Sequence, residues 1–226
     1  MILLEFAVSI VVGWFFLHRQ FALAAPMLPV DLFRRPLFAL SVATAICAHG
    51  AQLIAFVALP FYFQYVSGLT PIQIGILITP WPAALVVMAP IAGRLADRHP
   101  AGLLGGFGLA VMTFGLLLVL FLPSPPAPVD VAWRLAVCGI GFGFFQSPNN
   151  RLIIASAPRD RAGAGSGMLS TSRLLGQTTG SALVALVFGI THGVELSTRF
   201  AIGMAAGFAG LAMVLSSLRL SLPRSG

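Results

Sequence analysis

Long apolar runs alternate with short arginine-containing segments along the whole chain. Most of these runs reach the roughly 20 residues that an α-helix needs to cross about 30 Å of hydrocarbon. The seven runs span residues 1–17, 37–66, 72–92, 102–122, 131–154, 163–190 and 200–218. The first run is short, and the second is long enough to tilt or to extend beyond the bilayer. The pattern predicts an all-α integral membrane protein with about seven transmembrane helices.

Composition supports a membrane protein over a soluble one. Of 226 residues, 58% are hydrophobic and 8% are charged, whereas soluble domains carry about 25% charged residues. The net charge of +7 comes from arginines spread over short loops, which is typical of membrane orientation, so no nucleic-acid partner is expected. Cys47 and Cys138 each lie inside an apolar run, and no disulfide, metal site or cofactor is expected.

The arginines are distributed unequally between the two sets of loops. One set and its flanking tail hold Arg19, Arg34, Arg35, Arg94, Arg98, Arg151, Arg159, Arg161, Arg219 and Arg224. The other set holds Arg134 and Arg199, and Arg173 lies within a run. Because basic residues accumulate in cytoplasmic loops, the N-terminus is predicted outside and the C-terminus inside the cell (inner) membrane.

The segment Gly93–Pro100 is a tight basic turn between two uncharged runs. The spacing of Gly93, Leu95, Asp97 and Arg98 resembles the signature loop of the major facilitator superfamily, which links the second and third helices of each six-helix half. The resemblance implies that Asp97 and the arginines latch neighbouring helices at the cytoplasmic face. The alternative is an ordinary charged turn. Pro100 replaces the usual Gly, and the family's following basic pair is absent.

The sixth run resembles the penultimate helix of the fourteen-helix drug–proton antiporters of that superfamily. The match includes an arginine embedded in the run, Arg173, and the pair Gly176 and Gly180, which predicts close helix packing. A polar stripe follows at helical spacing and consists of Ser166, Ser170, Arg173, Gln177 and Ser181. Such a stripe within a span faces the bundle interior or a water-filled cavity. Arg173 is interpreted either as a cavity charge or as a structural clamp.

The fifth run carries glycines and polar residues on one helical face. Gly139, Gly143, Gln146 and Asn150 recur at helical spacing. Small residues let helices approach closely in a bilayer, so the glycines predict a packing face. Gln146 and Asn150 are candidates for the lining of a polar cavity. A dinucleotide-binding loop is not expected, because no short strand precedes the glycines.

Two further polar positions have competing interpretations. His49 and Gln52 are neighbours on the second run, and the resemblance implies that this helix borders a central cavity and that both residues lie on the path of substrate or protons. The alternative for His49 is packing within the bundle. Glu5 is either a proton-relay acid or an interfacial acid that water reaches.

The resemblance covers nearly the whole chain and implies its domain organisation. Residues 1–17 correspond to a partial or inserted helix, 18–36 to a cytoplasmic linker, and 37–226 to the C-terminal six-helix half. The family is built from two such halves, so the chain is interpreted as a fragment or half. A missing N-terminal half, from the same gene or a separate chain, is an expected partner.

The function predicted on this basis is secondary transport. The resemblance implies proton-coupled efflux of drugs or other small amphipathic molecules by alternating access. The expected partners are the lipid bilayer, a small-molecule substrate and protons. An enzyme is not expected, because the four histidines are scattered without acidic partners. A non-transporting membrane scaffold or assembly subunit is the alternative, and the sequence does not name the substrate.

Overall fold

The computed structural model describes residues 30–124, 126–156 and 162–221, together with the isolated residues Val8, Val11 and Phe15. Within these residues six helices are long and apolar enough to cross a membrane, and no strand is present. The prediction of an all-α membrane protein is confirmed. Apart from these three isolated residues, the predicted first span, residues 1–17, lies outside the described residues, as does most of the linker 18–36.

The helices follow the predicted runs closely. In chain order they are η1 (Val30–Arg34), α2 (Pro36–Tyr65), α3 (Pro71–Ile78), α4 (Pro80–Leu95), α5 (Ala101–Leu120), α6 (Pro128–Ala155), α7 (Ala162–Ile190), α8 (Val194–Leu218) and η3 (Arg219–Ser221). Four of the α-helices begin at a proline, which suits the first turn because the missing N–H has no helical acceptor there.

The last helix begins earlier than the sequence suggests. It starts at Val194 rather than near Phe200. The charges between them predict a loop, but Glu195 and Arg199 form an ion pair of 3.1 Å one turn apart on the helix surface. The charged residues are therefore the first turns of α8, and Glu195 lies where a carboxylate meets the partial positive charge of the helix N-terminus.

The predicted third span is interrupted at Thr79, where α3 ends and α4 begins. Pro80 and Pro82 lack an N–H, so the carbonyl oxygens of Ile76 and Ile78 lose their normal helical donors. Together the two helices still form one apolar span of 25 residues. A discontinuous helix is tolerated in a membrane where other protein groups or water satisfy the freed carbonyls.

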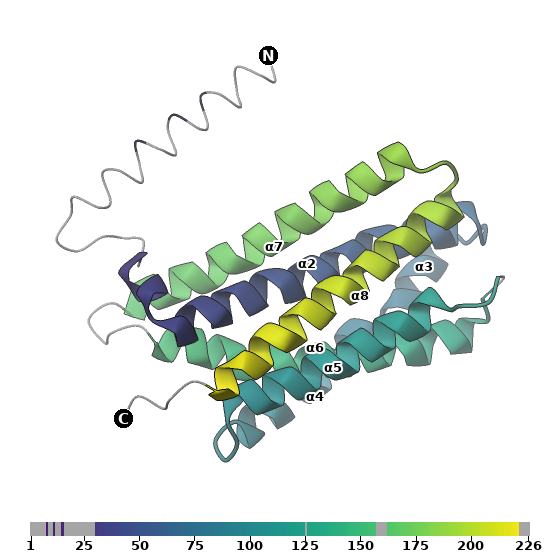
Figure 1. Ribbon diagram of the computed structural model, residues 1–226. Coiled ribbons are helices and arrows are strands. Elements are labelled where there is room, and N and C mark those ends of the chain that lie inside the picture. The colour runs from purple at the N-terminus through teal and green to yellow at the C-terminus, as the bar shows by residue number, and fades with distance from the viewer. Residues whose placement is uncertain are drawn as a thin grey trace.

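The helices run side by side in a bundle (Figure 1). Helix α2 packs against α7 and α8, α5 packs against α6 and α8, and α4 packs against α6. Helix α7 lies along one side of the bundle beside α2. The loop Gly93–Pro100 and residue 221 lie at the same end, called here the loop end, and residues 66–70 and 191–193 lie at the opposite end.

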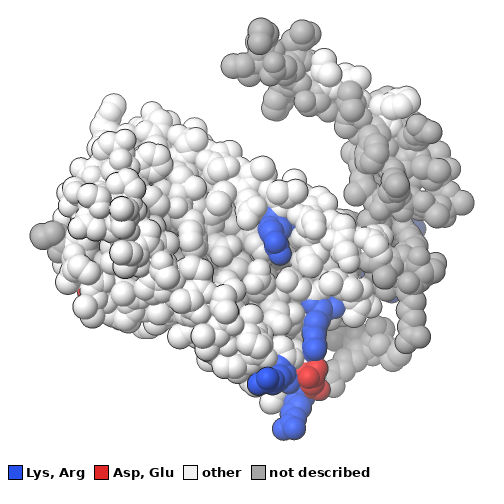
Figure 2. All heavy atoms as spheres, turned by 180° about the vertical axis from the view of Figure 1, so that it is seen from behind, with Lys and Arg blue, Asp and Glu red and all other residues white. Residues whose placement is uncertain are grey.

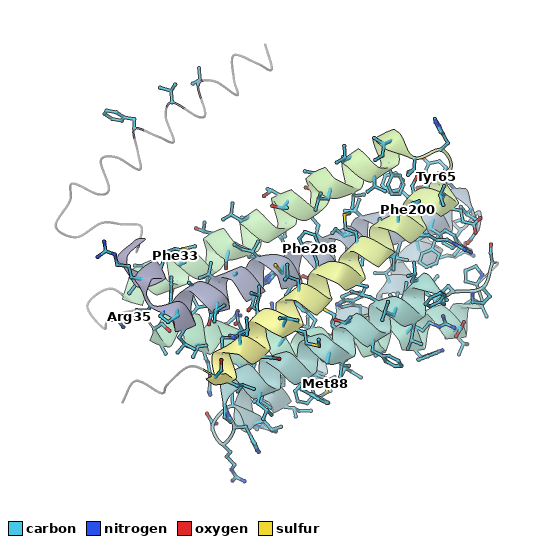
Figure 3. All side chains as sticks on the ribbon, in the orientation of Figure 1. Phe33, Arg35, Tyr65, Met88, Phe200 and Phe208 are labelled. Atoms are coloured by element: carbon cyan, nitrogen blue, oxygen red, sulfur yellow. The ribbon has the colours of Figure 1, made fainter. Side chains whose placement is uncertain are left out.

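Close helix approach depends on glycines at several crossings. A Cβ added to Gly108 of α5 would lie 2.6 Å from the carbonyl oxygen of Gly141 on α6. A Cβ on Gly139 of α6 would overlap the carbonyl of Trp81 on α4. Phe208 on α8 lies over α2 (Figure 3), against Gly50. Such backbone-to-backbone packing is how helices associate in a bilayer.

Candidate functional site

The polar stripe of α7 lies on an exposed face of the bundle. Ser166, Ser170, Arg173 and Ser181 are exposed, and Gln177 is half-buried. The Ser170 hydroxyl donates to the Ser166 carbonyl at 3.2 Å, which satisfies that hydroxyl within the helix. Arg173 has no ion pair within the described part of the chain. The stripe therefore presents a cation and several polar groups in the middle of a membrane-capable helix.

The face of α7 beside the polar stripe is held against α2 by glycines. A Cβ on Gly176 would overlap the Ile46 carbonyl, and one on Gly180 would lie 2.8 Å from the Gly50 carbonyl oxygen. Both α7 positions are buried. Gly176 and Gly180 therefore set the separation of α2 and α7 and leave the polar stripe facing outward.

His49 lies at this junction of α2 and α7, and its side chain is only 2% exposed. Its Nδ1 lies 2.8 Å from the Ala45 carbonyl oxygen. A carbonyl only accepts, so Nδ1 carries the hydrogen and Nε2 holds the free lone pair of the neutral ring. Nε2 is buried without a hydrogen-bond partner among the described residues. The imidazole packs edge-on against Phe142, with ring centroids 5.4 Å apart.

The remaining predicted path residues are distributed over two helices. Gln52 is half-buried on α2, one turn from His49, and Gln146 is half-buried on α6. Asn150 is also half-buried, and its Oδ1 has no partner among the described residues. A Cβ added to Gly176 of α7 would lie 3.1 Å from the Cβ of His49, and Gly176 is one turn from Arg173. His49 and Arg173 therefore lie on adjoining helices near the α2–α7 junction, whereas Asn150 lies nearer the loop end of α6.

The glycines of the fifth predicted run face α4. A Cβ on Gly143 would lie 3.0 Å from the Cβ of Met88. Gly139 contacts the backbone at Trp81, as described above, and Trp81 packs edge-on against Phe56 of α2. The indole Nε1 of Trp81 is buried without a described partner. Gly139 and Gly143 therefore allow the helix that follows the interruption at Thr79 to lie directly on α6.

The loop Gly93–Pro100 is joined to α6 by an ion pair. Arg151 Nη1 lies 2.5 Å from Asp97 Oδ1, and their side chains are 59% and 61% exposed. The same nitrogen donates to the Gly93 carbonyl at 3.3 Å. Leu95 is half-buried at the end of α4, and Arg98 is exposed in the turn. In Figure 2 basic side chains lie beside an acidic one at one end of a mostly uncharged face.

A buried polar network at the loop end was not predicted from the sequence. Arg219 is 5% exposed and donates to Ser41 Oγ at 3.2 Å, Asn149 Oδ1 at 2.7 Å and Ser216 Oγ at 2.6 Å. We call these four residues the Arg219 network. The sequence pattern places Arg219 only among the basic residues of the tail. The signal that could have located it is the set of polar residues near the same end of three different apolar runs.

These features describe a multi-pass helical membrane protein with polar groups inside its spans. The described residues contain no cluster of His, Cys, Asp and Glu that could hold a metal ion. A family model described as Major Facilitator Superfamily matches residues 3–181. The chain belongs to this superfamily, as predicted from the signature loop and the sixth run.

Curated relatives extend the comparison. The chain is 50% identical over 221 residues to the uncharacterized transporter YebQ of Escherichia coli strain K12, covering 98% of this chain and 48% of YebQ. It is 29% identical over 170 residues to the riboflavin transporter RibZ of Clostridioides difficile strain 630, covering 75% and 37%. It is 31% identical over 162 residues to the multidrug resistance protein Stp of Mycobacterium tuberculosis strain H37Rv, covering 72% and 30%. The chain spans less than half the length of each relative.

Proposed function

We propose that the chain is the C-terminal half of a secondary transporter that expels drugs or other small amphipathic molecules in exchange for protons. The main support is the polar face of α7. Arg173 lies about 16 Å along the helix from Ala162 at 1.5 Å per residue, and α7 is 29 residues long. A cation near the bilayer centre costs at least about 2.5 kcal/mol unless water or polar protein groups surround it.

The exposed stripe therefore faces a polar cavity between this half and an N-terminal half. Several curated relatives are more than twice as long as this chain, which leaves room for such a half. The α3–α4 span is as sparsely buried as α7, with 17% of its most apolar window covered in each case. Both helices are available to contact the second half. Alternating access then moves one half against the other around the cavity.

In this proposal the loop end faces the cytoplasm. The arginine asymmetry of the sequence supports this orientation. The ion pair between Asp97 and Arg151 would lie at the cytoplasmic surface, where it ties the loop after α4 to the end of α6. The polar residues assigned to the path of substrate and protons are His49, Gln52, Gln146, Asn150, Arg173 and Gln177.

His49 is the proposed proton-binding group of this half. Its Nδ1–H is already committed to the Ala45 carbonyl, so an arriving proton binds the lone pair of Nε2 and forms an imidazolium without breaking that bond. The nearby charge of Arg173 opposes a second positive charge in the same region. A proton on His49 is then favoured when an anionic group or water enters beside Arg173. This arrangement would couple the charge state of the cavity to its hydration.

The substrate class rests on the relatives. Stp is named as a multidrug resistance protein and RibZ as a riboflavin transporter, and both names indicate small organic molecules. The aromatic residues Phe56, Trp81 and Phe142 lie among the buried helices near the proposed path. Planar amphipathic molecules suit such surroundings, because aromatic rings stack on them.

Substrate-dependent proton flux in proteoliposomes tests the proposal. The chain together with its N-terminal half would be reconstituted with a pH-sensitive dye inside, and lipophilic cations such as ethidium would be added under an imposed pH gradient. A transporter gives a dye response that requires both substrate and protein and that a protonophore abolishes. Correctly folded protein with no flux for a broad panel of drugs would instead favour a scaffold or assembly subunit.

A further inference from the structure

We infer that Arg219 is a positioning residue for the loop Gly93–Pro100, and that it acts through the last turns of α6. The Arg219 network lies inside the bundle, whereas the ion pair between Asp97 and Arg151 lies on its surface. Both include a residue from the same short segment of α6, Asn149 and Arg151. This inference concerns the mechanics of the loop end and does not depend on the identity of the substrate.

Arg219 joins three helices and the start of η3. Its guanidinium donates to Ser41 on α2, to Asn149 on α6 and to Ser216 on α8. Ser216 in turn donates to the Gly102 carbonyl of α5 at 3.1 Å. No carboxylate contacts the guanidinium within the described part of the chain. The guanidinium is a buried cation held only by neutral acceptors. Each acceptor matters to its stability, because the loss of one leaves a buried N–H donor unsatisfied.

Asn149 is oriented by both ends of its amide. Its Oδ1 accepts from Arg219 at 2.7 Å, and its Nδ2 donates to the Ser41 carbonyl at 3.3 Å. Asn149 is 1% exposed, whereas Arg151 is exposed on the other side of the helix. Two residues correspond to about 200° of rotation along an α-helix. The inward contacts of Asn149 therefore set the direction in which Arg151 points.

Pro148 increases the importance of these side-chain contacts. It lies inside α6 and is buried, and it has no N–H to bond the carbonyl of Phe144. The last turns of α6 are therefore attached to the rest of the helix by one hydrogen bond fewer. Their position depends more strongly on contacts with other helices, and Asn149 makes the two just described.

The outward-facing side of the last turns of α6 contacts the loop Gly93–Pro100. Arg151 contacts both Asp97 and the Gly93 carbonyl. An exposed ion pair between long side chains is weak by itself, so it orders the loop only where the backbones on both sides are already held. On the loop side, the N–H groups of Arg98 and His99 donate to the Leu95 carbonyl at 3.0 Å and 2.9 Å. On the helix side, the Arg219 network supplies that restraint.

Hydrogen–deuterium exchange of the loop amides tests the coupling. Asn149→Ala removes the α6 acceptor but leaves Arg219 bonded to Ser41 and Ser216. We expect exchange at Asp97, Arg98 and His99 to become about fivefold faster, because opening of these turns reports local stability. Asp97→Asn should cause a similar increase. The double variant should exchange no faster than either single variant, since both changes release the same restraint.

A matched control exists at the opposite end of the bundle. Arg134 on α6 is also held by a carboxylate and a carbonyl, Asp130 at 2.8 Å and the Leu118 carbonyl. Arg134→Gln should speed exchange near residues 121–124 and leave the Gly93–Pro100 loop unchanged. Equal loop protection in wild type and Asn149→Ala would overturn the inference, as would increases that multiply in the double variant.

Arg219→Lys provides a second variant if Asn149→Ala does not accumulate. Lysine keeps the charge but lacks the planar group that bridges three acceptors at once, so loop exchange should again rise. If both variants fail to fold while Arg134→Gln folds, the network serves folding alone and the inference is rejected. Exchange requires no substrate, so its outcome is separate from the proton-flux experiment.

Discussion

The six membrane-capable helices fall into two groups that hydropathy does not distinguish. The most apolar window of α2 has a mean hydropathy of 1.8 and is 61% buried inside the protein. The corresponding window of the α3–α4 span has a mean hydropathy of 1.9 and is only 17% buried, as is that of α7. In a membrane an apolar residue is equally suited to lipid and to protein, so hydropathy predicts which segments span the bilayer but not which ones lie inside the bundle.

The two exposed spans also differ from each other. The exposed positions of α3–α4 include the large apolar residues Ile72, Ile76, Val86 and Val87, which suit lipid or an apolar partner. Helix α7 also exposes large apolar residues such as Leu174 and Leu186. Its polar stripe adds Arg173 and hydroxyl groups, which require water or a polar partner. The closely packed helices provide a rigid scaffold, and α7 presents the polar chemistry on that scaffold.

Gly141→Ala should disrupt the closely packed group more than any other small substitution considered. A Cβ at Gly141 would overlap the backbone nitrogen of Met112 and lie 2.6 Å from the Gly108 carbonyl oxygen. Backbone cannot rotate away as a side chain can, so we expect a loss of about 3 kcal/mol or more, seen as a lower thermal unfolding midpoint or as aggregation in detergent.

The matched control is Gly167→Ala on α7, where an added Cβ meets nothing within 4 Å. Alanine is the better helix former by about 0.5–1 kcal/mol, so this variant should be as stable as wild type or slightly more so. Similar destabilisation by the two substitutions would contradict the division into closely packed and exposed helices.

Arg173→Gln should abolish transport without loss of stability. Arg173 is exposed and makes no described ion pair, so the fold does not depend on it, whereas the proposed cavity loses its cation. Arg173→Lys keeps the charge without the planar fork. We expect at least a tenfold lower rate of proton-coupled transport for the glutamine variant and partial activity for the lysine variant, at equal protein levels. Normal transport by Arg173→Gln would exclude the cavity role.

His49→Gln should flatten the pH dependence of transport. Glutamine can donate to the Ala45 carbonyl but does not bind a proton between pH 5 and 8, as histidine does. We expect an approximately tenfold lower rate of transport driven by a pH gradient, with substrate binding retained. The comparison of pH–rate profiles for the variant and wild type measures this effect. An unchanged profile would assign His49 to packing against Phe142.

Asp97→Asn should lower transport by several-fold while membrane levels stay normal. The carboxylate pairs with Arg151 at the exposed loop end, so its charge contributes to loop geometry and little to global stability. Initial rates of proton flux and quantitative blots of membranes would separate the two effects. Arg98→Gln is the control within the same turn, because Arg98 is exposed and has no ion pair among the described residues.

Particular residues show which features of the fold and the site can be predicted from the sequence and which cannot. The apolar runs located six spans, and the loop and Arg173 identified the superfamily. The interruption at Thr79 was missed because both sides are apolar, and the start of α8 was missed because Glu195 and Arg199 resemble loop charges. Asn149 escaped notice because a helical face drawn through Gly139 and Gly143 continues to Asn150. Arg219 was assigned to the tail, since a sequence pattern carries no information about which distant acceptors surround a guanidinium.

The smallest effect is expected within the packed group itself, on α8. Arg199 lies near the start of α8, and Arg219 directly follows its last residue at the start of η3. The Arg199 side chain is 54% exposed and pairs with Glu195 one turn away, and such pairs contribute about 0.3–0.5 kcal/mol. Arg199→Ala should therefore shift the unfolding midpoint by about 1–2 °C at most, and less in high salt, because salt screens exposed charges.

Arg219→Ala, at the residue that follows α8, gives the contrast. It removes a buried guanidinium and leaves Ser41, Asn149 and Ser216 without their shared donor, so a much larger drop in the midpoint is expected. The unfolding midpoints of both variants at low and high salt measure the difference. A large, salt-insensitive drop in the midpoint for Arg199→Ala would show that the contribution of an arginine to stability depends on its location on a closely packed helix. A small effect would show that burial of the individual side chain determines stability, because the two arginines lie near the two ends of α8 and differ in their exposure.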